Sequence, residues 1–98
     1  MRLGNCPPNY QVFICEHVFA NTRPIKLVVY DNDGDLCLLC GLDDHDWEAN
    51  RPRVVGLGHL IDRHEGIKDI DLLPNFEAQL MEDNQWVILP MSMGSEGQ

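Results

Sequence analysis

The sequence predicts a small α+β domain: a mostly antiparallel sheet built on two β-hairpins, with one or two short helices packed on it. Asp33-Gly34 separates two apolar runs and is typical of a tight hairpin turn, in which both central residues take positive φ. Apolar and polar residues alternate over 76–81, and a second β-rich run follows at 86–89, which indicates another hairpin. Between the hairpins, apolar residues recur at helical spacing.

Length and composition suit one domain over residues 1–98, with an ordered core over about 10–90 and irregular ends at 1–9 and 91–98. The net charge of −9, from 16 acidic and 7 basic residues, argues against nucleic-acid binding, which needs a basic surface. The first ten residues lack the apolar segment of a signal peptide, and no apolar run reaches the roughly 18 residues of a membrane span. We therefore expect a cytoplasmic protein that binds neither nucleic acid nor membrane.

The first half of the chain is expected to form a strand over 11–15 and a hairpin over 25–41, while 16–20 fits either a continued strand or a helical turn. A two-residue turn at Asp33-Gly34 pairs Tyr30 with Cys37 and Val29 with Leu38. Side chains alternate along a strand, so this register defines one core face. Its expected members are Ile25, Leu27, Val29, Leu36, Leu38 and Cys40.

The second half begins with a polar segment over 42–53, which predicts a long exposed loop. A short β-like run at 54–56 precedes two short helices, expected over about 58–64 and 67–73 and ended by Pro74. In the closing hairpin, a loop at Asp83-Asn84 would pair Leu80 with Val87 and Ala78 with Leu89.

The four cysteines are expected to be thiols, because disulfides are rare in a reducing cytosol. Cys37 and Cys40 match the C-x-x-C spacing of some metal and redox sites. Within a strand, however, residues three apart point to opposite faces, so this pair is not expected to form a joint site.

A different set of residues suits a metal better. Cys15 and His17 would share a face of an extended segment, and Cys40 and His45 would join them if the strands at 11–15 and 36–40 are neighbours. Cys15, His17, Cys40 and His45 are therefore the candidate ligands of a structural zinc ion, against the alternative of buried thiols and exposed histidines.

The acidic loop is the candidate interaction surface, because its carboxylates, an aromatic ring and a cation suit a protein interface. Its candidate residues are Asp43, Asp44, His45, Asp46, Trp47 and Arg51. The only serines are Ser92 and Ser95, in the expected tail, and glycine-rich phosphate loops are absent. No catalytic residue is assigned, and we expect a non-enzymatic protein.

Three segments resemble a bacterial domain-of-unknown-function family that is related to immunity proteins of polymorphic toxin systems. They are the Asp-Gly hairpin that runs into Leu39-Cys40-Gly41, the segment VGLGHL at 55–60, and the junction at 73–77. The resemblance covers roughly residues 11–89 and implies an α+β fold with a protein-binding role. With the net charge of −9, which attracts a basic partner, we expect binding to a basic protein such as a toxin that the chain would neutralise. We expect no cofactor, with zinc as the alternative.

Overall fold

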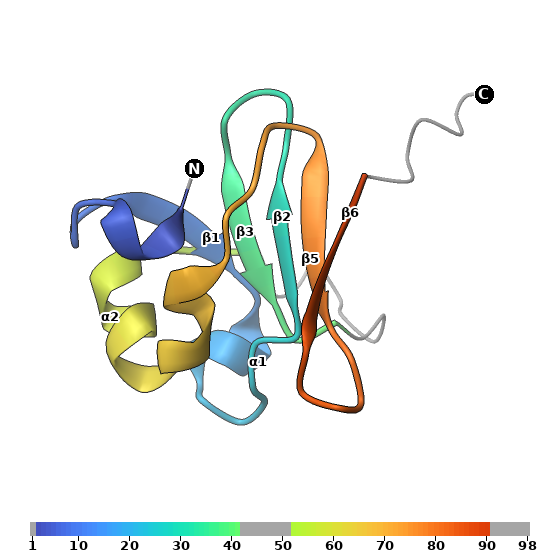
Figure 1. The fold of residues 1–98 in the computed structure, drawn as a ribbon. Helices are drawn as coiled ribbons and strands as arrows, with labels where there is room; N and C mark the ends of the chain where they lie inside the picture. The colour runs from blue at the N-terminus through green and yellow to red at the C-terminus, as the bar shows by residue number, and fades with distance from the viewer. Residues whose placement is uncertain (1, 42–51, 91–98) are drawn as a thin grey trace.

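The computed structural model describes residues 2–41 and 52–90, which fold into one six-stranded sheet with helical segments packed against it (Figure 1). The strands are β1 (Gln11–Ile14), β2 (Leu27–Tyr30), β3 (Leu36–Leu39), β4 (Arg53–Gly56), β5 (Phe76–Leu80) and β6 (Trp86–Pro90). The helices are α1 (Glu16–Phe19) and α2 (Leu57–Arg63), with 3-10 turns η1 (Leu3–Asn5) and η2 (Glu65–Asp69). None of the helices in these described parts is long and apolar enough to cross a membrane.

The α+β class is confirmed, but the expectation of a sheet built on two antiparallel hairpins was incomplete. The strand order is β4-β1-β3-β2-β5-β6, and β1 pairs with β3 in parallel. The reason is that β3 folds back from β2 and inserts between β2 and β1. This places β3 beside a strand that runs in its own direction, so the sheet is mixed.

The first hairpin closes with a three-residue loop over 32–34, and the predicted two-residue turn was wrong. The Asp31 N–H donates to the Asp35 carbonyl at 3.0 Å, and Gly34 has φ +88°. This is a type I turn followed by a left-handed residue, a common three-residue hairpin. The Asp31 carboxylate holds the loop by accepting from the Asp33 and Asp35 N–H groups at 2.9 and 3.0 Å.

The extra loop residue moves the register by one position, which exchanges the two faces of β2. Val28 pairs with Leu38 and is fully buried, whereas Leu27 and Val29 are half-buried on the other face. On β3 the predicted core positions are confirmed. Leu36 and Leu38 are both fully buried.

The closing hairpin shows the same one-residue difference. The Met81 N–H donates to the Gln85 carbonyl at 2.9 Å, and Asn84 takes a positive φ of 65° as the last loop residue. Leu80 therefore pairs with Trp86, and Ala78 with Ile88, in place of the predicted Val87 and Leu89.

The helical segments cover one face of the sheet (Figure 1). The first predicted helix is confirmed as α2, one residue earlier than expected, but the second is the 3-10 turn η2, which ends at Asp69. The chain is extended at Ile70, and Asp71 forms a β-bridge with Arg2. The core between helices and sheet consists of Leu3, Val12, Ile14, Cys15, Val18, Ile25, Val28, Leu36, Leu38, Cys40, Leu57, Leu60, Ile67, Ile70, Leu72 and Ala78.

Gly58 packs against Pro8 so closely that a side chain should destabilise the protein. A Cβ there would lie 2.8 Å from Pro8 Cβ and 3.0 Å from its Cα. Alanine normally favours a helix over glycine by about 1 kcal/mol, but overpacking typically costs about 1–3 kcal/mol. We therefore expect Gly58→Ala to lower the free energy of unfolding in urea.

Gly66→Ala is the control for this prediction. A Cβ at Gly66 meets no atom within 4 Å, so that variant should be neutral or slightly stabilised. Equal stabilisation of both variants would show that Pro8 moves aside without cost.

Candidate metal centre

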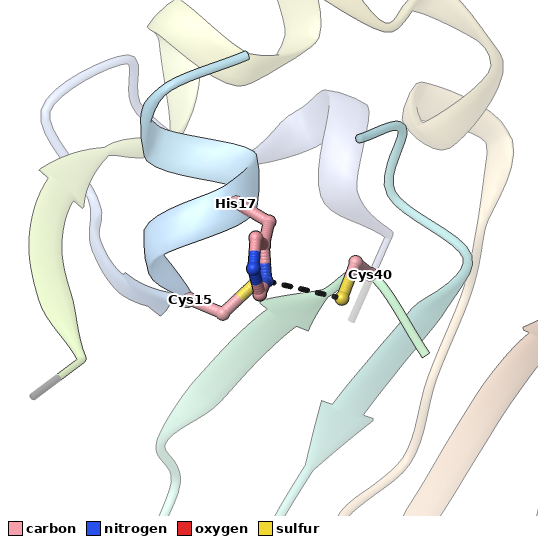
Figure 2. Close-up of side chains that lie close together, drawn as sticks. All are labelled: Cys15, His17 and Cys40. Atoms are coloured by element: carbon pink, nitrogen blue, oxygen red, sulfur yellow. Dashed lines mark hydrogen bonds between the residues drawn. The ribbon is translucent and has the colours of Figure 1, made fainter. Parts of the chain in front are cut away.

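Three of the four predicted metal ligands lie together at one end of the sheet. Each of Cys15, His17 and Cys40 offers one ligand atom, and these atoms are all within 4.8 Å of one another (Figure 2). His17 Nδ1 and Cys40 Sγ are 3.8 Å apart. Cys15 and His17 are close in the sequence, but Cys40 is not, so tertiary folding has to bring Cys40 to the other two.

The parallel pairing of β1 and β3 brings the cysteines together. Ile14 on β1 is the partner of Leu38 on β3, and Cys15 and Cys40 follow shortly after these residues. Neighbouring parallel strands end at the same edge of a sheet, so both thiols emerge at that edge. The condition set in the sequence argument, that these two strands are neighbours, is met, and the strands are parallel.

His17 reaches the cluster by a different route from the predicted one. The sequence argument placed Cys15 and His17 on one face of an extended segment, but helix α1 begins at Glu16. Cys15 is the N-cap, with an extended backbone at φ −79° and ψ 166°, and His17 lies in the first turn. His17 lies in the cluster as the sequence argument expected, but on a helical turn and not on an extended segment, and 16–20 fitted either conformation.

The spacing of the three ligand atoms is close to what a zinc ion needs. With Zn–S of about 2.3 Å and Zn–N of about 2.0 Å, a tetrahedral ion separates its ligand atoms by roughly 3.5–3.8 Å. The 3.8 Å between His17 Nδ1 and Cys40 Sγ fits this separation, and the 4.8 Å limit for the group leaves at most about 1 Å of contraction. Small side-chain rotations would therefore bring all three atoms onto one ion.

Burial distinguishes this cluster from a chance surface group. Cys15 is fully buried, Cys40 is 2% exposed and His17 is half-buried. A metal held here would be shielded from water on the core side and reached from the side of His17.

Arg23 is a neighbour of the cluster that the sequence argument missed. Its Nη1 donates to Cys40 Sγ at 3.7 Å and lies 3.3 Å from His17 Nδ1. A guanidinium only donates, so His17 Nδ1 accepts this hydrogen bond with its single lone pair. Arg23 therefore orients His17 in the metal-free protein, and this hydrogen bond has to break before Nδ1 can bind a metal. In the sequence, the only feature that could have pointed to Arg23 is its positive charge in the loop before the predicted hairpin.

The other cysteines are not part of this centre. Cys37 lies on the opposite face of β3 from the core and is absent from the ligand group, which agrees with the prediction that the C-x-x-C pair forms no joint site. Burial raises the pKa of the Cys37 thiol, and the nearby Asp31 and Asp35 carboxylates raise it further. Burial also raises the pKa of Cys6. Both pKa shifts disfavour the thiolate that binds metal.

His64 should make stability depend on pH. Its Nε2 is buried with no hydrogen-bond partner among the described residues, and burial, followed by the neighbouring Arg63, lowers its pKa. The unfolded chain therefore binds a proton more readily as the pH falls through the unfolded value of about 6.5, which lowers the free energy of unfolding. Between about pH 7.5 and about pH 5.5, the wild type should lose more stability in urea than His64→Gln. Identical losses in the two proteins would contradict this assignment.

Residues 42–51 lie outside the described part of the chain. The predicted interaction residues, Asp43, Asp44, His45, Asp46, Trp47 and Arg51, all fall there, as does the fourth predicted zinc ligand, His45. The interaction surface and the fourth ligand remain predictions.

The chain was compared with family models, curated proteins and solved structures. No family model matches the chain, and neither the curated proteins nor the solved structures contain a match. The resemblance to immunity-related proteins therefore remains a prediction, and the functional argument rests on the geometry of the cluster.

Proposed function

We propose that the protein is a small, non-enzymatic domain that binds one zinc ion through Cys15, His17 and Cys40. The observation that carries the proposal is the convergence of three ligand atoms within 4.8 Å at the ends of β1 and β3. Thiolate sulfur and imidazole nitrogen are donors that zinc prefers, and a structural site needs a fourth ligand, for which His45 is the predicted residue. Two thiolates would balance the charge of the ion.

The zinc ion would act as a cross-link. Cys15 and His17 belong to the junction of β1 and α1, and Cys40 belongs to the end of β3. One ion held by all three would tie this junction to the centre of the sheet, which a chain of 98 residues with a modest core can use for stability. His45 remains the predicted fourth ligand, and His45→Ala tests it separately.

Metal titration tests the proposal directly. The chelator-treated protein should bind one equivalent of zinc by elemental analysis, and cobalt should give the intense sulfur-to-metal absorption of thiolate ligands. Cys40→Ala should lose this absorption, whereas Cys37→Ala, the matched control three residues away, should keep it. A protein that binds no zinc, or that binds it equally well in both variants, would rule out this centre.

Protein binding is the second proposal, and the exposed strand β6 favours it. β6 pairs only with β5 in the described sheet, and its side chains Val87, Ile88 and Leu89 are 36%, 43% and 38% exposed. An apolar edge strand offers backbone groups that a strand of another protein can pair with. A net charge of −9 suits a basic partner, as the resemblance to immunity proteins implies.

Affinity capture with surface variants tests this second role. A tagged chain should recover one specific protein, and Ile88→Lys should abolish that recovery. Leu73→Lys alters another exposed apolar residue, 63% exposed, and should leave recovery unchanged. If no specific protein is recovered, or if both variants recover it equally, β6 is ruled out as the binding interface.

A further inference from the structure

A cavity of about 400 Å³ lies beside the metal centre and shares Cys40 with it. The cavity is formed where β2 begins and where β3 and β5 end, because β2 is antiparallel to both neighbours. Leu27, Cys40 and Gln79 contribute one wall from each of these places. The loop before β2 contributes Arg23 and Lys26.

The lining of this cavity is basic although the chain is strongly acidic. Arg23 and Lys26 are two of only 7 basic residues in the chain. None of the 16 acidic residues is among the described residues that line the cavity. Two cations in one concave site produce a local positive potential that attracts small anions, against the negative field of the whole molecule.

The Lys26 backbone and the Arg23 guanidinium are held in place before any ligand arrives. The Lys26 N–H donates to the Leu39 carbonyl, and the Lys26 carbonyl accepts from the Leu80 N–H, each at 2.9 Å. This fixes the Lys26 backbone to β3 and β5. The Arg23 guanidinium is held by His17 Nδ1 at 3.3 Å and Cys40 Sγ at 3.7 Å. A site that is partly positioned in this way loses less entropy when it binds a ligand.

We propose that this cavity binds a small anion that carries a carboxylate or phosphate group, with Lys26 and Arg23 as its binding residues. Ammonium and guanidinium groups form charge-assisted hydrogen bonds with both kinds of oxygen. The anion would lie next to Cys40 and so adjoin the metal centre. The proposal rests on the cavity and its two cations, and it does not require bound zinc.

Lys26→Gln and Lys68→Gln make a matched pair of variants. These are the only two lysines in the chain, both are exposed, and each substitution removes one positive charge. Lys26 lines the cavity and Lys68 belongs to η2, outside it. Comparing the two variants therefore separates a specific site from the effect of net charge.

Amide NMR titration with inorganic phosphate and with succinate, at constant ionic strength, tests the proposal. At least one probe should produce saturable shifts at Lys26, Cys40 and Gln79. Lys26→Gln should weaken that binding about tenfold, as expected for loss of one charge-assisted hydrogen bond, whereas Lys68→Gln should change it by less than about twofold. Saturation by phosphate alone assigns a phosphoryl ligand, and saturation by succinate alone assigns a carboxylate.

Two results would overturn the anion site: no saturable shift with either probe, or equal weakening by both variants. A parallel zinc titration in phosphate-free buffer separates this proposal from the metal centre. Lys26→Gln should bind zinc as the wild type does. If the protein binds the anion but no zinc, the metal centre is ruled out and the anion site is not.

Discussion

Zinc should raise the free energy of unfolding by about 4 kcal/mol when its free concentration is a thousand times its dissociation constant, because it binds the folded chain and not the unfolded one. For a domain of this size, that gain corresponds to a rise in Tm of roughly 15–30 °C. Urea unfolding and thermal melting, each with zinc and with chelator, measure the effect. The gain should shrink at acid pH, because the ligands must lose their protons to bind metal.

Variants of the cluster separate the metal effect from ordinary loss of packing. Cys40→Ala should show no zinc-dependent gain, while Cys37→Ala, on the opposite face of β3, should keep the full gain. Comparing each variant with and without zinc cancels any change in its metal-free stability. A zinc-dependent gain that persists in Cys40→Ala would place the ion elsewhere.

Leu38→Ala should cost about 2–5 kcal/mol of stability, the usual range for deleting a buried leucine side chain. Leu38 is fully buried on β3, between Ile14 of β1 and Val28 of β2, in the middle of the sheet. A domain of this size typically has only about 5–15 kcal/mol in total, so the variant is expected to be close to its folding limit. Urea unfolding measures the change.

Leu73→Ala is the control for this prediction, because it removes the same atoms from a side chain that is 63% exposed. Its stability should change by less than about 0.5 kcal/mol. Similar losses in the two variants would mean that Leu38 does not pack in the core as described. Zinc should partly restore Leu38→Ala, since the ion would tie β3, which carries this residue, to the end of the neighbouring strand β1.

Local sequence patterns located nearly every strand. The alternation over 76–81 corresponds to β5, and the β-rich runs around Asp33-Gly34 correspond to β2 and β3. These patterns act between near neighbours in the chain, where side-chain alternation and turn residues have direct structural consequences. The second predicted helix was less well defined, because three apolar residues at a spacing of three are compatible with a 3-10 turn followed by an extended segment.

Hairpin register was missed at both hairpins for the same reason. The pairs Asp33-Gly34 and Asp83-Asn84 predict two-residue loops, but Gly34 and Asn84 are the left-handed third residues of longer loops. A residue with positive φ fits either loop, so the turn residues locate the hairpin without fixing its register. Packing decides between the registers, because only the observed one brings Val28 onto the same face as Leu38.

The sequence by itself determined the class of the fold and three residues of the candidate metal centre, Cys15, His17 and Cys40, because thiols and an imidazole near strand ends suit a metal. The tertiary structure alone decided that β3 inserts beside β1 in parallel, and this brings Cys40 to Cys15. It also placed Arg23 against His17 and, with Lys26, on the wall of the cavity. Strand order depends on how whole faces pack, so contacts between residues 17 or more positions apart, such as Arg23 and Cys40, could not be read from the chain alone.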